Sequence, residues 1–293
     1  MMKAFVTRAG IVVVAGLCLL VPGSASPLQG QQKVALVNVI ADASGPLREL
    51  TAKDFIVTED NQKREVLAAE LTQDPLSIVL LVDSTQPPMG QVPPTQDLRS
   101  SLATFVKTLQ GYNPTLQIAM AEFAGASVPR VPFSAKPGDL EAAIGRLFPN
   151  QQQDAVLLEA LVDAGKLMNE QPPPRRAIVA VDFNSKEGSA ERSMRPAADA
   201  VTKVGATLWS VSVRGTAQPT PIREEVLNKV IQNNGGLRLM PVDASGLTPN
   251  LKIVANSLSS QYMITFMRQG NNPKALKFET TKGAKVQLTP WMR

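Results

Sequence analysis

The sequence predicts an α/β protein with a doubly wound, mostly parallel sheet, to which both ends of the chain add a small flanking β module. Three observations predict this fold class. Between residues 77 and 267, apolar runs rich in β-branched residues alternate with segments of helical periodicity. These apolar runs are continuous, which is typical of strands covered by helices on both faces. The stretches outside this range show strand patterns and turn residues without helical periodicity.

The central elements are expected in an alternating order. Strands are expected at residues 77–83, 116–123, 127–133, 177–182, 206–213, 237–242 and 262–267, and helices at residues 95–109, 138–147, 154–169, 194–204, 221–233 and 247–259. Pro129 and Pro132 place the strand at 127–133 at an edge, because proline has no N–H to donate to a ladder. Thr95 is the expected N-cap of the first helix. That helix carries apolar side chains on one face, at Leu98, Leu102, Phe105, Val106 and Leu109.

Both flanks of this region have strand patterns. Strands are expected at residues 34–41, 55–58 and 63–69, and a hairpin is expected over residues 275–288 with its turn at Lys282 and Gly283. A lone hairpin is marginally stable in water, so neither flank can bury a core by itself. We therefore expect the two flanks to pack together as one discontinuous β module. The expected boundaries are 26–74 for the N-terminal β segment, 75–268 for the α/β domain and 269–293 for the C-terminal hairpin.

Residues 1–25 have the pattern of a signal peptide. Lys3 and Arg8 precede an uncharged run over residues 10–21, and small residues follow, so cleavage is expected after Ala25. The apolar run is shorter than the roughly 20 residues of a membrane-spanning helix, which makes an uncleaved anchor the weaker alternative. We therefore expect a protein that contacts the membrane only during export and is then secreted or periplasmic, within the cell envelope.

Composition excludes several classes of site. The chain has no histidine, and its single cysteine, Cys18, lies in the expected signal peptide. A Ser-His-Asp triad, a Cys-His pair and histidine-ligated zinc are therefore excluded. Removal of residues 1–25 would leave 28 basic against 25 acidic residues, a net charge of about +3. No long basic stripe occurs and the aromatic residues are scattered, so we expect no nucleic-acid partner.

Two of the expected buried strands end in aspartate, at Asp83 and Asp182. Open α/β sheets bind ligands beyond the carboxyl ends of their strands, at the point where the strand order reverses. Ser84 and Thr85 follow the first aspartate, and together these side chains would offer a hard divalent cation several oxygen ligands. The alternative is structural, because strand-end aspartates often accept hydrogen bonds from loop N–H groups.

Four stretches of the chain carry a family resemblance. They are a lead-in at residues 37–42 and 50–60, the first domain strand at residues 75–83, and the entry to the last strand at residues 260–264. In these stretches the sequence resembles secreted bacterial proteins that carry a von Willebrand factor A related domain. The resemblance implies a von Willebrand factor A-like fold for the central domain. It also implies docking to protein partners, usually through a metal-ion-dependent adhesion site (MIDAS).

The resemblance places an incomplete MIDAS on Asp83, Thr85 and Asp182. The family's Asp-x-Ser-x-Ser element reads Asp-Ser-Thr-Gln-Pro here, so its last position supplies no ligand. The family's threonine corresponds to Ala155, with Asp154 beside it as a candidate substitute. Because fewer oxygen ligands weaken cation affinity, we expect weak Mg²⁺ or Ca²⁺ binding at most, and no other cofactor. Asp83→Ala should then be nearly neutral or even stabilising, because neighbouring carboxylates without a strong cation repel each other.

We expect an exported, non-enzymatic protein-binding or adhesion module that docks a protein partner through loops at the carboxyl end of the sheet, at residues 84–94 and 183–192. The side chains expected to contact the partner are Gln86, Met89, Gln91 and Asn184. Two alternatives remain open. One is a metal-dependent hydrolase in which Asp83 and Asp182 provide both ligation and proton transfer. The other is a structural envelope component whose β module pairs through an open strand edge.

Overall fold

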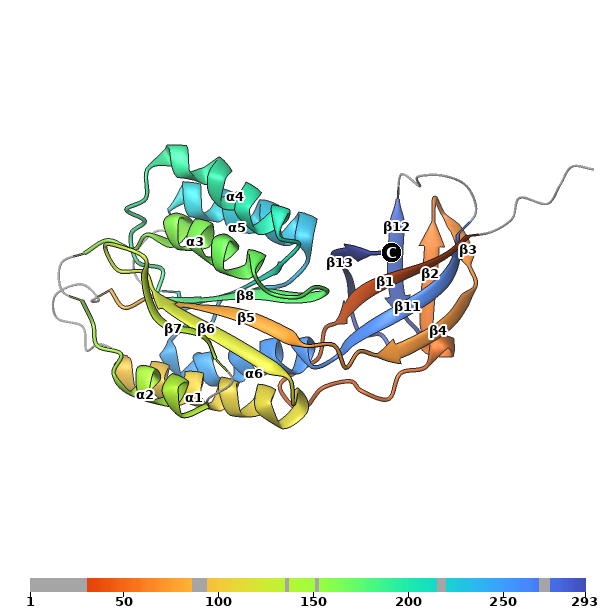
Figure 1. The fold of residues 1–293 in the computed structure, drawn as a ribbon, viewed down its shortest axis with the longest axis horizontal. Coiled ribbons are helices and arrows are strands. Elements are labelled where there is room, and N and C mark those ends of the chain that lie inside the picture. Colours follow the sequence, from red (N-terminus) through yellow and green to blue (C-terminus); the bar gives the residue numbers. More distant parts are fainter. Residues whose placement is uncertain (1–30, 86–93, 135–136, 151–152, 215–219, 269–274) are drawn as a thin grey trace, which may run out of the picture.

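The computed structural model describes residues 31–85, 94–134, 137–150, 153–214, 220–268 and 275–293. The signal peptide expected at residues 1–25 lies outside this part of the chain. The described residues form a layered α/β domain and, beside it, a module of β-strands (Figure 1). The doubly wound α/β fold class predicted from the sequence is confirmed.

The α/β domain is built on a six-stranded sheet in the order β10-β9-β8-β5-β6-β7. Its strands, in chain order, are β5 (Leu76–Val82), β6 (Leu116–Glu122), β7 (Val128–Ser134), β8 (Arg175–Asp182), β9 (Thr207–Ser212) and β10 (Arg238–Leu239). Strands β10, β9, β8, β5 and β6 run parallel, whereas β7 pairs with β6 in the antiparallel direction. As its prolines predicted, β7 lies at an edge of the sheet.

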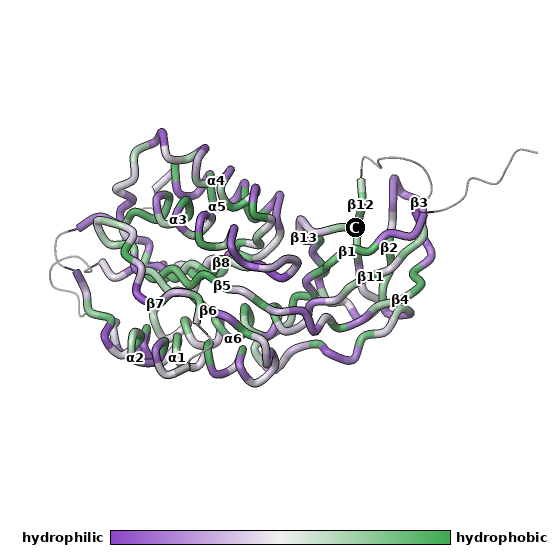
Figure 2. Tube along the Cα trace, viewed as in Figure 1, coloured by the Kyte–Doolittle hydropathy of each residue, from purple (hydrophilic) through white to green (hydrophobic). Residues whose placement is uncertain are grey.

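Helices cover both faces of this sheet (Figure 1). They are α1 (Thr95–Tyr112), α2 (Pro137–Gly145), α3 (Leu157–Asn169), α4 (Met194–Lys203), α5 (Pro221–Asn234) and α6 (Leu247–Leu258). One apolar core joins α1, α2 and α6 to the sheet, and a second joins α3, α4 and α5 to its other face. Along each of these helices, hydrophobic and hydrophilic residues alternate (Figure 2). No helix in the described part of the chain is both long and apolar enough to cross a bilayer.

One helix cap and one helix start differ from the prediction. The N-cap of α1 is Pro94, and Thr95 is already the first helical residue, so the expected threonine cap is wrong. Helix α3 begins at Leu157 because the chain just before it is extended: Ala155 forms β-bridges with Ala124 and Glu187. The apolar face predicted for α1 is buried throughout.

The β module consists of two antiparallel sheets, in the orders β13-β1-β11-β4 and β12-β2-β3. Its strands are β1 (Gln31–Val39), β2 (Phe55–Glu59), β3 (Gln62–Arg64), β4 (Val66–Leu71), β11 (Gln261–Arg268), β12 (Leu276–Thr280) and β13 (Val286–Met292). Strands from both ends of the chain thus share one apolar core. Within it, the ring of Phe55 lies 5.3 Å from that of Tyr262, and the ring of Phe266 lies 5.7 Å from that of Phe278.

The topology corrects two expectations for the C-terminal part. Residues 262–267, expected as the last strand of the parallel sheet, belong to β11, which lies antiparallel between β1 and β4 in the β module. The expected boundary at residue 268 therefore separates β11 from strands with which it shares a core. The turn at Lys282 and Gly283 is present, but β12 pairs with β2 and β13 pairs with β1. The expected hairpin is wrong because its two strands pair with β2 and β1 of the N-terminal segment and not with each other.

A buried arginine lies where the α/β domain meets the β module. The guanidinium of Arg175, at the start of β8, donates to Gln261 Oε1 (2.6 Å), the Asp74 carbonyl (2.8 Å), Asn113 Oδ1 (2.8 Å) and the Leu258 carbonyl (2.9 Å). Burial lowers the pKa of Arg175 to about 10, and these acceptors compensate the charge it carries at neutral pH. The β module is therefore tied to the amino end of the central sheet, at the end of the strands away from Asp83 and Asp182 (Figure 1).

Candidate functional site

The two strand-end aspartates meet where the sheet changes its direction of winding. From β5 the chain adds β6 on one side, and it later adds β8, β9 and β10 on the other. Val82 and Val181 are register partners in the parallel β5–β8 pair, so Asp83 and Asp182 follow them side by side. As the sequence predicted, the two carboxylates lie at adjacent strand ends, at the position where open α/β sheets bind ligands.

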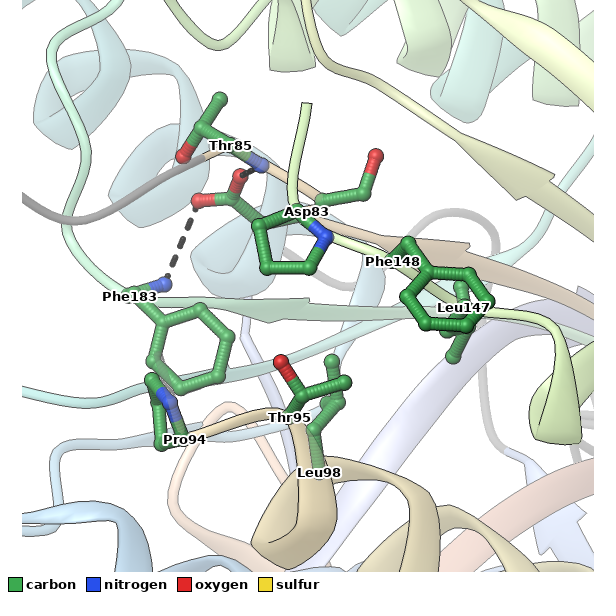
Figure 3. A pocket seen from close by; sticks show the side chains of 10 residues that line it. Asp83, Thr85, Pro94, Thr95, Leu98, Leu147, Phe148 and Phe183 are labelled. Carbon is green, nitrogen blue, oxygen red and sulfur yellow. Dashed lines mark hydrogen bonds between the residues drawn. The ribbon is translucent and has the colours of Figure 1, made fainter. Parts of the chain in front are cut away.

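Asp83 organises the loops that follow both strands. Its Oδ1 accepts a hydrogen bond from the Thr85 N–H (2.9 Å), and its Oδ2 accepts from the Phe183 N–H (3.3 Å) (Figure 3). The Ser185 hydroxyl donates to the same Oδ2 (2.8 Å) and lies 2.5 Å from the Thr85 hydroxyl. The Asp83 side chain is buried, so these donors compensate its charge. The structural reading of this aspartate therefore accounts for its contacts.

Asp182 is held by a different set of donors. Its Oδ1 accepts from the Asn184 N–H (2.8 Å) and from Arg223 Nη1 (3.3 Å), and its Oδ2 accepts from the Ser212 hydroxyl (2.5 Å). Arg223 also donates from Nε to Glu187 Oε2 (3.0 Å) and from Nη2 to the Ser185 carbonyl (2.7 Å). The side chains of Arg223, Asp182 and Glu187 are all 0% exposed. The cluster is therefore a buried triad of one guanidinium and two acidic side chains. Burial raises the pKa of Asp182 above its ordinary value, although the charge of Arg223 and the Ser212 hydroxyl act against this rise.

Arg223 supplies the positive charge that the expected cation would have supplied. Burial by itself lowers the pKa of Arg223, but Asp182, Glu187 and Asp83 act against it and together raise the pKa above its ordinary value. The repulsion expected between Asp83 and Asp182 is therefore offset by a guanidinium of the chain itself. This overturns the physical reason for expecting a nearly neutral Asp83→Ala substitution.

Helix α5 positions Arg223 through its periodicity. Arg223 lies three residues before Val226, four before Leu227 and seven before Val230, so all four side chains share the buried face of the helix. The sequence reasoning missed this residue. An arginine on the apolar stripe of a helix was the available signal, because a buried arginine requires acceptors or an anionic partner. Glu187, in a polar loop, carried no comparable signal.

Asp154 and Ala155, the other positions considered for the metal site, contribute no side chain to this triad. Asp154 is partly exposed, and its carboxylate forms an ion pair with Lys186 Nζ at 2.7 Å. Ala155, expected at the position of the family's threonine, is fully buried in its β-bridges. Among the described residues, no group of three or more histidine, cysteine, aspartate or glutamate side chains could hold a metal ion. The donor set beside Asp182 does not fit a divalent cation, because a guanidinium already lies there.

The structure describes one of the four residues expected to contact a partner, Asn184. Asn184 adopts a positive φ of 53°, is only 4% exposed, and has its N–H directed to Asp182. The loop turns Asn184 inward in this conformation, so the residue leaves little surface for contact with a partner. Gln86, Met89 and Gln91 lie outside the described residues.

A small cavity of about 20 Å³ adjoins Asp83. Thr85, Leu98, Phe148 and Phe183 are among the residues that line it (Figure 3). This volume is enough for about one water molecule, which needs roughly 10–15 Å³. The described residues around this cavity therefore leave room for about one water molecule beside Asp83.

Solved structures share this fold. A von Willebrand factor type A protein from Catenulispora acidiphila superposes with a TM-score of 0.55 at 10% identity, over 88% of this chain and 72% of that one. Proximal thread matrix protein 1 from the mussel byssus, with a zinc-occupied MIDAS motif, gives a TM-score of 0.51 at 12% identity, over 70% of this chain and 50% of that one. The chain has a von Willebrand factor A-like fold, as the sequence resemblance implied.

Comparison of the sequence with protein-family models gives no match. Comparison with curated protein sequences gives no match either. At the identities found among solved structures, the likeness concerns the fold alone.

Proposed function

We propose that this protein is an exported, non-enzymatic protein-binding module of the cell envelope that docks its partner at the carboxyl edge of the central sheet without a divalent cation. The observation that carries the proposal is the buried contact of Arg223 with Asp182 and Glu187. The mussel byssus protein holds zinc in its MIDAS motif. In this chain, a guanidinium supplies positive charge beside the second strand-end aspartate.

The permanent charge of Arg223 makes docking independent of cations in solution. A cation that must be bound from solution makes a docking surface depend on the ionic composition around it, whereas an arginine is charged at every physiological pH. The triad also fixes the loop after β8, because Arg223 bonds the Ser185 carbonyl and Ser185 bonds Asp83. A loop that is ordered before binding loses less conformational entropy when a partner docks.

The geometry gives the two alternative functions less support. A hydrolase built on Asp83 and Asp182 would need carboxylate oxygens directed at substrate or metal, and both carboxylates are buried and engaged within the protein. A structural role through an open edge would use a strand such as β13, which is an edge of its sheet. Pro290 lies within β13 and has no N–H to donate to an added strand.

Export is part of the proposal and has a direct test. If the signal peptide is cleaved after Ala25, the protein recovered from the envelope or the medium begins at Ser26 and contains no cysteine. Intact mass spectrometry of the exported form measures this. Retention of Met1 in the envelope fraction would contradict cleavage.

We call the carboxyl edge of the central sheet, where the partner is proposed to dock, the docking edge. Its role and its metal independence can be tested together. Mature protein, immobilised through its C-terminus, is used to capture partners from an envelope extract in EDTA and in millimolar Mg²⁺ or Ca²⁺. We expect equal capture in all three buffers, and a melting temperature that does not respond to the ions, because ligand stabilisation follows RT ln(1 + [L]/Kd). Capture that requires the ions would contradict metal independence.

Two charge reversals locate the docking edge. Lys186 belongs to the loop after β8 and is 77% exposed, so Lys186→Glu should reduce capture. Lys203, an exposed residue at the far end of α4, provides the matched control, and Lys203→Glu should leave capture unchanged. Equal capture by both variants would place the docking surface elsewhere.

A further inference from the structure

An exposed phenylalanine with arginines around it lies next to the aspartate site. We define the arginine patch as Arg99, Arg130, Arg146 and Phe148. Building on the proposed function, we propose that this patch binds an acidic segment of a protein partner in which an Asp or Glu adjoins a large apolar side chain. The patch is connected to the site through Asn150, which donates from N–H to the Ser84 carbonyl (2.6 Å) and from Nδ2 to the Ser84 hydroxyl (3.0 Å).

The apolar part of the patch is a single ring held in place. Phe148 is 66% exposed, whereas the preceding Leu147 is 1% exposed and belongs to the main core. The guanidinium carbon of Arg99 lies 4.6 Å from the centre of the Phe148 ring, and Arg99 Nε donates to the Leu147 carbonyl at 3.1 Å. Leu147 and Phe148 come from the same loop, with Phe148 beside the Asp83 region (Figure 3). An aromatic ring stacked with arginine is the composition that protein interfaces favour.

The charged part of the patch lines a hollow of about 370 Å³. Arg130, Arg146, Phe148 and Asn150 line it together with Glu122, the one acidic residue among its lining. Glu122 is buried and accepts from Arg130 Nε at 2.6 Å, so these two charges compensate each other. No described residue forms a hydrogen bond or an ion pair with the exposed guanidinium of Arg146. The hollow therefore carries one positive charge in excess.

Charge and shape together identify the class of partner. A guanidinium without a partner among the described residues, such as that of Arg146, presents a planar fork of donors that matches a carboxylate in two-point contact. The exposed ring beside it requires apolar surface for burial, which a bare anion does not provide. A protein segment that carries both a carboxylate and a large apolar side chain satisfies both requirements at once. This places the specificity of the docking edge in the patch and leaves the buried triad to hold the neighbouring loop.

The first experiment measures the chemistry of recognition. Full-length mature protein is applied to an array of heptapeptides in which an Asp or Glu is placed next to each of the other residue types. We expect the strongest binding where Phe, Leu, Ile or Tyr adjoins the acidic residue. Replacement of the acidic residue by its amide, or of the apolar residue by Gly, should each reduce binding at least fivefold. The proposal would be overturned if the Gly-substituted peptides, or vesicles of an anionic phospholipid, bound as strongly as the best peptide. Such a result would show that the patch attracts anions of any kind.

The second experiment uses variants of the patch. Arg146→Glu should lower the affinity for the best peptide at least tenfold, Phe148→Ala at least fivefold, and Arg146→Lys less than Arg146→Glu because it keeps the charge and loses the fork. The matched control is Arg195→Glu, because Arg195 is 90% exposed and lies outside the patch. All changed side chains are exposed, and equal melting temperatures verify folding. Affinity unchanged in both Arg146→Glu and Phe148→Ala would overturn the proposal.

The envelope capture assay separates failure of this inference from failure of the proposed function. Capture that is lost in Lys186→Glu but retained in Arg146→Glu and Phe148→Ala would keep the docking edge and remove the patch from it. Capture that is insensitive to all three variants would contradict both. Loss in the patch variants, with Arg195→Glu unchanged, supports both.

Discussion

Arg223 and Asp182 form an ion pair in which neither side chain is exposed, with Nη1 3.3 Å from Oδ1. Glu187 accepts from Nε of the same guanidinium at 3.0 Å. Buried ion pairs are weak sources of net stability, but removal of one partner leaves an uncompensated charge in the interior. The pairing therefore makes the conformation of the loop after β8 depend on a residue of α5.

Substitution of Arg223 tests whether this arginine acts as an internal cation. Arg223→Ala leaves Asp182 and Glu187 buried without their counterion, and we expect a loss of about 3–5 kcal/mol in the free energy of unfolding. The variant should also gain a response that the wild type lacks, since millimolar Ca²⁺ can now approach these carboxylates and raise the melting temperature. Thermal and urea unfolding in EDTA and in Ca²⁺ measure both effects, with Arg195→Ala as the exposed control. A wild-type protein stabilised by Ca²⁺ as strongly as the variant would contradict the assignment.

Asp83 should be more important for stability than the sequence indicated. Asp83→Ala removes the acceptor for two backbone N–H groups and for the Ser185 hydroxyl. Because a hydrogen bond to a charged group contributes about 1.5–3 kcal/mol, we expect a loss of at least about 2 kcal/mol in urea unfolding. Asp199→Ala is the control, because Asp199 is 69% exposed in a surface pair that contributes little. A stability equal to that of the wild type would restore the expectation of repelling carboxylates.

Arg175 should couple the β module to the α/β domain. In Arg175→Met the buried Gln261 and Asn113 side chains lose a donor, so amide exchange in β1 and β11 should accelerate relative to β5. Arg176→Met is a matched control, because Arg176 donates to the Gln171 and Val204 carbonyls within the α/β domain. Hydrogen exchange by mass spectrometry measures the difference. Identical exchange patterns for the two variants would remove the coupling role.

The two flanks should fold as one unit. Deletion of residues 275–293 removes β12 and β13, and with them one of the two partners of β2 and the partner on one side of β1. We expect amide protection over residues 33–70 to fall sharply, while protection in β5 and β8 is retained. Hydrogen exchange on the full-length and truncated proteins compares the two. Unchanged protection over residues 33–70 would show that the N-terminal strands are stable alone.

Tyr262 should make the β module sensitive to alkaline pH. Its hydroxyl donates to the Leu47 carbonyl (3.0 Å) and accepts from the Leu50 N–H (3.1 Å), and burial raises its pKa above the ordinary value of 10.0. The unfolded chain therefore loses this proton first as pH rises, so the contribution is present below pH 10.0 and declines as pH rises toward the folded pKa.

Tyr262→Phe isolates this contribution. We expect the wild type to lose more free energy of unfolding than the variant between pH 9 and 11, because only the wild type has the ionisable hydroxyl at this position. Tyr112→Phe provides the control, since Tyr112 is 37% exposed. Urea unfolding across this pH range measures the difference. Parallel pH profiles for wild type and Tyr262→Phe would contradict the prediction.

Sequence patterns alone predict the order of the central elements from β5 to α6 and the meeting of Asp83 with Asp182. Both follow from local information: apolar runs and helical periodicity define the strands and helices, and parallel register brings equivalent strand ends together. The apolar face of α1 and the edge position of β7 were predictable for the same reason.

The surroundings of the two aspartates and the pairing of the last strands depend on contacts between distant parts of the chain. Arg223 lies 41 residues after Asp182, and the contact of β13 with β1 joins Thr289 to Leu36 across 253 residues. A strand pattern indicates which residues face a core, but several edges can satisfy the same backbone hydrogen bonds. The choice of β1 as the partner of both β11 and β13, and of an arginine as the counterion of Asp182, depends on packing that no single segment contains.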